Sequence, residues 1–264
     1  MSNVTSTDGT TIGYERSGTG PPLVLVDGAM CYRASGPMRG FAAALQNSFT
    51  VYAYDRRGRG ESGDTLPFAV EREVDDLRAL VAEAGGTAYG FGISSGAALL
   101  LRAAAGGVGF ARLALYEPPF MSETDGGAWS REYTARLDET LSAGRNGDAI
   151  ALFMMSVGIP PEAVAGMRGQ PFWPVLEAVA PTLAYDNAVM GDAAVPRAAA
   201  TIAVPTLVAA GAASPDNLRA AAKAAAAAVP GAVHRELPDQ THDVSPDALA
   251  PVLTKFFTQA RPGR

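Results

Sequence analysis

Two serines stand side by side in the stretch "YGFGISSGAALLL", residues 89–101. Ser94 has Gly92 two positions before it and Gly96 two positions after it, which makes the pattern G-x-S-x-G. In that pattern a strand turns sharply into a helix and leaves the serine oxygen exposed at the edge of the sheet. Ser95 has the bulky Ile93 two positions before it, so Ser94 is the predicted nucleophile. A small residue at a crowded turn would give the same pattern, so a catalytic role for Ser94 requires a second residue that activates it.

The second residue must be a base, because a serine hydroxyl is unreactive near neutral pH until its proton is removed. The chain has two histidines, His234 and His242. His234 falls inside the strand pattern "AVHRELP", residues 232–238, where we expect a structural role. His242 falls in "PDQTHDVSP", between the last predicted strand and the last predicted helix. A serine first and a histidine last is the chain order expected with such a turn, so His242 is the predicted base.

The elements that position these residues follow from an alternation of short apolar runs with helical patterns. Strands, helices and strands in alternation predict an α/β fold with a mostly parallel sheet flanked by helices. In front, residues 3–16 predict an antiparallel hairpin that turns at Asp8-Gly9. Ligands bind such sheets beyond the carboxyl ends of the strands, where both Ser94 and His242 fall. The predicted strands are 21–28, 49–55, 87–92, 112–118, 205–211 and 232–238, and the predicted helices are 37–47, 69–85, 94–107, 217–229 and 246–260.

Residues 121–200 interrupt the alternation with helical patterns at 130–144, 147–158 and 171–186. We expect a helical insertion that leaves the sheet after one strand and returns before the next. The core would then comprise residues 1–120 and 201–264.

Composition limits the class of protein. The 264 residues include 48% hydrophobic and 18% charged side chains, which is typical of a globular protein. A net charge of −6 leaves no basic surface for nucleic acid. The single cysteine, Cys31, fits a reducing compartment, and neither a signal peptide nor a membrane-spanning run is evident. We expect a cytoplasmic protein with a small-molecule substrate and no nucleic-acid or membrane partner; the oligomeric state stays open.

One further motif carries a resemblance to a known family. The stretch "YDRRGRGES", residues 54–62, matches the pattern D-x-R-G-x-G-x-S. Together with "GISSG" and "THD", it makes the chain resemble the α/β-hydrolase superfamily, in its serine-nucleophile, capped, esterase-like branch, over essentially the whole length. The resemblance implies an α/β-hydrolase fold in which residues 121–200 form the helical cap. It does not identify a substrate.

The resemblance also implies an acid that orients His242 and stabilises its imidazolium form. Many members carry this acid shortly after the strand that here ends in "VAAGAASPDN", where alanine and serine occupy the expected positions. Asp216 lies a little further on. Glu117, in "LALYEPPF", directly follows the preceding strand, where relatives similar to haloalkane dehalogenases carry the acid. A salt bridge or a helix cap would also account for Glu117. We favour Glu117 over Asp216 and leave both open.

The oxyanion hole departs from the family pattern as well. Members usually have His-Gly after the strand that leads into it, whereas this chain has Asp27 in "VDGAM". Backbone N–H groups stabilise the oxyanion, so the change need not abolish the hole. By position the donors are Ala29 and Ser95. Asp27 is expected to make structural hydrogen bonds to nearby loops, and its charge would weaken the binding of anionic substrates.

A serine at the turn disfavours the epoxide-hydrolase and dehalogenase chemistry of relatives with an aspartate nucleophile. Acyl transfer remains: Ser94 attacks a carbonyl, and His242 accepts the proton and later activates water. This chemistry needs no cofactor, and no metal site is predicted. Apolar residues of the insertion are expected to form mostly cap core and in part a pocket for a hydrophobic ester, lactone or thioester; Cys31 is expected to be a packing residue. The residues in question are Phe153, Met154, Met155, Met167, Phe172 and Trp173, with Met30, Cys31 and Tyr32 after the oxyanion position.

Two alternatives stay open. A lyase, a cyclase or a cofactor-free perhydrolase would share Ser94 and His242. A ligand-binding protein derived from a hydrolase is the alternative without catalysis, and the unusual position of the acid is the feature that supports it.

Overall fold

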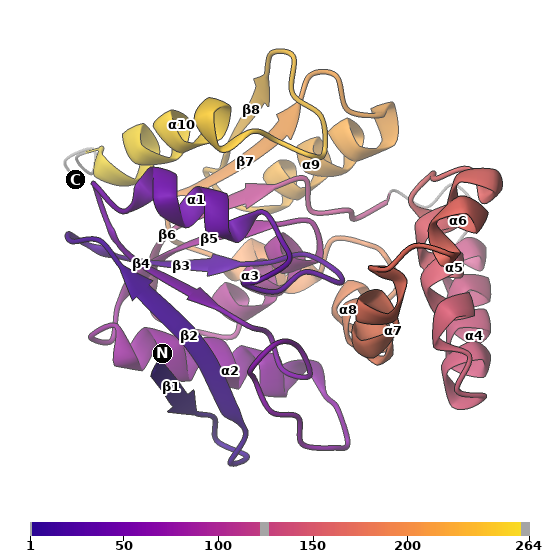
Figure 1. The fold of residues 1–264 in the computed structure, drawn as a ribbon. Coiled ribbons are helices and arrows are strands. Elements are labelled where there is room, and N and C mark those ends of the chain that lie inside the picture. The colour runs from indigo at the N-terminus through magenta and orange to yellow at the C-terminus, as the bar shows by residue number, and fades with distance from the viewer. Residues whose placement is uncertain (1, 122–126, 260–264) are drawn as a thin grey trace.

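The computed structural model describes residues 2–121 and 127–259 (Figure 1). Its centre is an eight-stranded sheet in the order β1-β2-β4-β3-β5-β6-β7-β8. From β4 to β8 neighbouring strands pair in parallel, whereas β1 and β2 form an antiparallel hairpin whose second strand pairs antiparallel with β4. The strands are β1 (Ser2–Thr5), β2 (Thr11–Ser17), β3 (Pro22–Val26), β4 (Thr50–Tyr54), β5 (Ala88–Ile93), β6 (Phe110–Tyr116), β7 (Thr206–Gly211) and β8 (Val233–Leu237).

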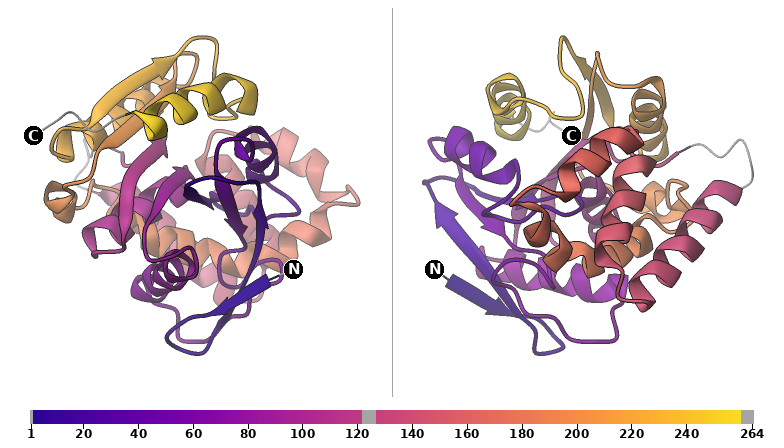
Figure 2. Two further views of the ribbon diagram at one scale, coloured as in Figure 1. Left: turned by 90° about the vertical axis from the view of Figure 1, so that its left-hand side faces the viewer. Right: turned by 45° about the vertical axis from the view of Figure 1, so that its right-hand side comes forward.

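Helices cover both faces of this sheet. On one face α1 (Met38–Leu45) and α10 (Pro246–Thr258) pack together over a core that includes Phe41, Phe91 and Phe257. On the other face lie α2 (Val70–Glu83), α3 (Ser95–Ala105) and α9 (Asp216–Ala228). The left panel of Figure 2 shows the sheet between these two layers. The central strands read as apolar runs because both of their faces are buried. The predicted α/β fold is confirmed.

The chain between β6 and β7 is helical. It contains α4 (Ala128–Ser142), α5 (Asn146–Ser156), α6 (Pro161–Arg168), α7 (Trp173–Val179), η1 (Ala180–Thr182), α8 (Leu183–Met190) and η2 (Arg197–Thr201), and its described residues include no strand. The helices α4 to α8, which we call the cap helices, lie beyond the carboxyl ends of the parallel strands (Figures 1 and 2). Residues 122–126 of the predicted insertion and residue 260 of the last predicted helix lie outside the described residues.

Two details differ from the sequence expectation. The short helix α6 was not predicted. The pattern 171–186, predicted as one helical segment, divides into α7, η1 and the start of α8. Pro181 lies inside η1 and has no backbone N–H to continue the helical hydrogen bonds, which explains the break. Within the described residues, no helix is both long and apolar enough to cross a membrane.

Candidate active site

Ser94 stands at a sharp turn between β5 and α3. Its backbone has a φ of 56° and a ψ of −128°, which is rare for a residue with a side chain. Such a conformation persists only where the surroundings enforce it. The Ser94 N–H donates to the carbonyl of Tyr116 at 2.9 Å, and its own carbonyl accepts from the N–H groups of Ala97 and Ala98. Strand β6 on one side and helix α3 on the other therefore hold the strained residue.

The two glycines of the motif are required by close backbone approach. A Cβ on Gly92 would lie 2.7 Å from the carbonyl oxygen of Gly96. A Cβ on Gly96 would lie 2.3 Å from the carbonyl oxygen of Val26, at the end of β3. Helix α3 can thus start close to the sheet only because neither position has a side chain.

Glu117 and His242 are in direct contact. The Nδ1 atom of His242 lies 2.7 Å from Oε2 of Glu117. Glu117 is fully buried directly after β6, and its Oε1 accepts the N–H of Gly211 at 2.8 Å. Burial alone would raise the pKa of Glu117, but hydrogen bonds from His242 and Gly211 hold that pKa below its ordinary value. An ionised Glu117 places the proton of a neutral imidazole on Nδ1 and leaves Nε2 free to act as a base.

Asp216, the alternative acid, lies elsewhere. It is exposed at the start of α9 and forms an ion pair with Arg219. His234 lies within β8, as the strand pattern predicted. Of the sequence candidates for the acid and the base, the structure therefore brings together Glu117 and His242.

Ser94 and His242 follow β5 and β8, so both lie at the carboxyl edge of the sheet. Among the described residues they form no hydrogen bond with each other; such bonds often tighten only when substrate binds. Tyr116, which was not predicted from the sequence as a site residue, connects their loops. The Oη of Tyr116 donates to the carbonyl of Thr241 at 2.5 Å, while the Tyr116 carbonyl accepts from Ser94. Tyr116 thus joins the serine turn to the residue before His242.

The loop after β3, residues 27–32, passes directly beside Ser94. A Cβ on Gly28 would lie 3.2 Å from the Cβ of Ser94. Met30 has a φ of 62°, another strained backbone position. Nη1 of Arg59 donates to the carbonyls of Gly28 at 2.7 Å and Cys31 at 3.3 Å. This loop carries Ala29, one of the two predicted oxyanion donors, and Arg59 holds it on both sides of that residue.

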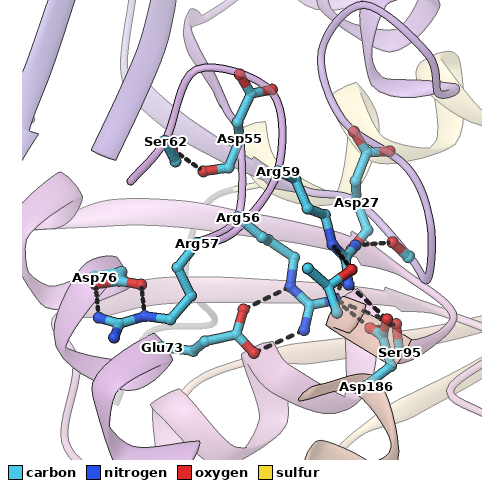
Figure 3. A network of polar contacts seen from close by, with 12 residues as sticks. Asp27, Asp55, Arg56, Arg57, Arg59, Ser62, Glu73, Asp76, Ser95 and Asp186 are labelled. Carbon is cyan, nitrogen blue, oxygen red and sulfur yellow. Dashed lines mark hydrogen bonds and ion pairs between the residues drawn. The ribbon is translucent and has the colours of Figure 1, made fainter. Parts of the chain in front are cut away.

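Ser95, the other predicted donor, is the first residue of α3, so its N–H has no partner within the helix. Its side chain is buried and turned into a polar network (Figure 3). The Ser95 Oγ donates to Oδ1 of Asp186 at 2.7 Å and accepts from Nη1 of Arg56 at 3.3 Å. The Ser95 hydroxyl therefore belongs to the network, and the predicted role as an oxyanion donor concerns only the backbone N–H.

The network pairs two buried arginines with two carboxylates. Arg56 binds Glu73 through two hydrogen bonds of 2.7 and 2.8 Å and binds Asp186 at 2.6 Å. Arg59 binds the other oxygen of Asp186 at 2.5 Å and the hydroxyl of Thr182 at 3.0 Å. These residues were not predicted from the sequence. The run of arginines in "YDRRGRGES" was the available signal, because buried guanidinium groups require carboxylate partners.

The D-x-R-G-x-G-x-S motif shapes the loop that carries Arg56 and Arg59. Asp55 accepts hydrogen bonds from the backbone N–H groups of Arg33 and Glu61, at 2.7 and 2.9 Å. Its carbonyl accepts from the Ser62 hydroxyl at 2.6 Å. Arg57 forms a bidentate pair with Asp76 on α2, at 2.6 and 2.8 Å. The motif is therefore structural: it orients a loop rather than contacting Ser94.

The structure does not bear out the hydrogen bonds to nearby loops that were expected for the Asp27 side chain. Its carboxylate is 1% exposed, and neither oxygen makes a hydrogen bond of ordinary geometry with the described residues. The side chain lies below the backbone of Gly36, whose Cβ, if present, would be 3.0 Å from Oδ1. Burial raises the pKa of Asp27 to about 7, against the opposing charges of Arg59 and Arg56. The two arginines do not form ion pairs with Asp27 because they already have carboxylate partners in Glu73 and Asp186.

Two further observations concern chemistry beyond the serine. Burial raises the pKa of the Cys31 thiol to about 12, which suits a packing role. Within residues 2–121 and 127–259, no group of three or more histidine, cysteine, aspartate or glutamate side chains could hold a metal ion.

A cavity of about 670 Å³ opens beside the 27–32 loop, between that loop, the motif loop and α7. Its lining includes Tyr32, Arg33, Gly58 and Val179 but neither Ser94 nor His242. The cavity is therefore adjacent to the candidate site rather than part of it.

The fold is that of an α/β hydrolase, and comparisons agree. The model of the alpha/beta hydrolase family matches residues 18–252, and the chain belongs to that family. A comparison with curated proteins gives no match. An alpha/beta hydrolase from Sphaerobacter thermophilus is 51% identical with a TM-score of 0.89, and the match covers 97% of this chain and 100% of that one.

More distant solved structures share the fold. A hydrolase from Pseudomonas aeruginosa is 22% identical, with a TM-score of 0.75 and coverage of 98% of both chains. An enol-lactonase from Burkholderia xenovorans is 24% identical, with a TM-score of 0.69 and coverage of 98% of this chain and 100% of that one. The resemblance seen in the sequence motifs is confirmed at the level of family and fold.

Proposed function

We propose that this chain is a serine hydrolase that cleaves a small to medium hydrophobic ester, lactone or thioester through an acyl-enzyme. The observation that carries the proposal is the contact between Glu117 and His242, 2.7 Å long, with Glu117 fully buried. A buried carboxylate on Nδ1 is the arrangement that orients an imidazole as a base. It occurs at the same sheet edge as the strained Ser94, which matches the expected nucleophile position.

In the proposed reaction, Oγ of Ser94 attacks the carbonyl carbon of the substrate while Nε2 of His242 takes its proton. The N–H groups of Ala29 and Ser95 donate to the oxyanion that forms. His242 then gives the proton to the leaving alcohol or thiol, and the acyl group remains on Ser94. A water molecule that loses its proton to His242 then attacks the acyl carbon. The bond between that carbon and Ser94 Oγ breaks, His242 returns the proton to Oγ, and the acid is released. Glu117 stays ionised throughout and stabilises the imidazolium.

The apolar surroundings support a hydrophobic substrate. Met30 belongs to the apolar cluster of the cap helices, and Ala29 and Tyr32 pack against it. Trp173 is buried in that cluster, with Phe153, Met154 and Met167 packed on it, whereas Met155 and Phe172 are exposed. Ala29, one of the proposed oxyanion donors, thus packs against apolar side chains, which favours a substrate with an apolar acyl or alcohol part.

The test is labelling by a fluorophosphonate, which reacts with an activated serine. Labelling of the wild type is expected, as is its loss in Ser94→Ala and in His242→Ala. Ser95→Ala keeps the backbone N–H and should still be labelled. Absence of labelling in folded wild-type protein, checked by circular dichroism, would contradict the proposal. A panel of p-nitrophenyl esters of increasing chain length, with matching thioesters and lactones, then tests the substrate class.

A further inference from the structure

We propose that Asp186, on cap helix α8, is a positioning residue that fixes both N–H donors of the oxyanion hole. This inference rests on the proposed function. Asp186 is buried, and its two oxygens bind different partners (Figure 3). Oδ1 accepts from Ser95 Oγ at 2.7 Å and from Arg56 at 2.6 Å, and Oδ2 accepts from Arg59 at 2.5 Å. One carboxylate from the cap thus reaches the segments of both proposed donors.

The first connection runs through Arg59 to the donor Ala29. Nη1 of Arg59 donates to the carbonyl of Gly28 at 2.7 Å. That carbonyl and the N–H of Ala29 belong to the same planar peptide group, and in a trans peptide they point in opposite directions. Holding the carbonyl toward Arg59 therefore aims the Ala29 N–H away from Arg59. Gly28 itself adjoins Ser94, since its Cβ, if present, would lie 3.2 Å from the Ser94 Cβ.

The second connection runs directly to Ser95. The Ser94 carbonyl is held by the N–H groups of Ala97 and Ala98, which sets the peptide plane that contains the Ser95 N–H. The hydroxyl of Ser95 is held by Asp186 and Arg56. The backbone of Ser95 is thus restrained by helix α3, and its side chain is restrained by Asp186 from the cap helices.

Charge explains why a carboxylate is needed at this position. Burial alone would raise the pKa of Asp186, but the charges of Arg59 and Arg56 hold it below its ordinary value, so Asp186 is ionised near neutral pH. Arg56 has a second carboxylate partner in Glu73. Within the described residues, Asp186 is the carboxylate that forms an ion pair with Arg59. Without it, Arg59 is a buried cation without its ion-pair partner, and its hold on Gly28 is expected to loosen.

The test compares Asp186→Asn with Tyr185→Phe. Tyr185 is the neighbouring residue on α8, and its hydroxyl donates to Asp64 at 2.5 Å, so its removal also breaks a contact between cap and core. With a cleavable ester, Asp186→Asn should lower kcat about 10- to 100-fold with KM within about twofold, because misaligned donors weaken transition-state binding. Tyr185→Phe should stay within about twofold in both constants. Fluorophosphonate labelling should slow in the same proportion as kcat.

A second measurement does not depend on activity. Hydrogen–deuterium exchange of the 27–32 loop should be faster in Asp186→Asn than in the wild type and in Tyr185→Phe. Equal kcat and equal exchange in the two variants would overturn the positioning role. If folded wild type does not react with fluorophosphonate, the proposed function fails, and the exchange data still decide whether Asp186 restrains the loop.

A third variant covers the case in which Asp186→Asn does not fold. Ser95→Ala removes one of the carboxylate's contacts and keeps the backbone donor and the ion pairs. It should remain folded and be labelled about three- to tenfold more slowly than wild type. Labelling at the wild-type rate would overturn the connection through Ser95.

Discussion

The hydroxyl of Tyr116 donates a hydrogen bond to the carbonyl of Thr241, 2.5 Å away, next to His242. Since the Tyr116 carbonyl also accepts from Ser94, one residue of β6 restrains both the nucleophile and the loop of the base. We expect Tyr116→Phe to lower kcat/KM about three- to tenfold and to reduce the free energy of unfolding by about 1 kcal/mol. Ester kinetics and urea unfolding measure the two effects.

The control is Tyr89→Phe. Tyr89 lies on the neighbouring strand β5 and stacks on Phe257, a contact that phenylalanine retains. Equal kinetics in the two variants would show that the Tyr116 hydroxyl does not restrain the histidine loop.

The contact between Glu117 and His242 predicts which carboxylate acts in catalysis. Glu117→Gln keeps the shape of the side chain but removes the charge that stabilises the imidazolium, so kcat should fall about 10²- to 10⁴-fold. Asp216→Asn should stay within about twofold of wild type, because Asp216 is exposed on α9 and paired with Arg219. Steady-state kinetics on one ester decides between them. A larger loss in Asp216→Asn would show that the acid has been assigned to the wrong residue.

Asp27 predicts an unusual dependence of stability on pH. Its pKa rises from 3.8 to about 7 on folding, so between these values the folded state binds more protons than the unfolded state. Stability from this group is therefore lost as the pH rises from about 4 to 7. At about 1.4 kcal/mol per pH unit, the cost of ionising it in the folded protein approaches roughly 4 kcal/mol above pH 7.

Asp27→Asn removes this titration. The variant should gain stability relative to wild type as the pH rises, with a clearly larger gain at pH 8 than at pH 5. Urea unfolding at both pH values measures it. Asp138→Asn, at an exposed carboxylate of α4, controls for the change in net charge. If the free energies of unfolding of wild type and Asp27→Asn differed by the same amount at both pH values, the prediction would be contradicted.

A glycine of the serine turn and a glycine of α6 predict opposite effects of the same substitution. Gly96→Ala would place a Cβ 2.3 Å from the Val26 carbonyl and should cost roughly 3 kcal/mol or more, with loss of labelling. Gly166→Ala lies in α6 with nothing within 4 Å of the added Cβ. Because alanine favours helix, it should stabilise the protein by roughly 0.5 to 1 kcal/mol. Thermal unfolding compares the two, and a tolerated Gly96→Ala would contradict the geometric argument.

Much of the fold could be predicted because its signals are local. The apolar runs that became β3 to β8 and the helical patterns between them depend on hydrophobic periodicity over a few residues. The turn at Ser94 depends on two glycines within two positions. The division of 171–186 at Pro181 and the short α6 were missed, since helix ends inside an insertion depend on packing as well as on propensity.

By itself, the sequence determined the order of strands and helices, the candidate nucleophile Ser94 and the candidate base His242. Only the tertiary structure decided that Glu117 rather than Asp216 contacts His242. Asp216 follows β7, the strand next to β8, but the loop after β7 leads it to the exposed start of α9, whereas Glu117 stays buried directly after β6. The tertiary structure also decided that Asp186 binds Ser95, a residue 91 positions away. A buried charge is costly unless it is paired, so such groups form contacts with oppositely charged side chains from distant segments. The local sequence does not specify which side chain becomes the partner.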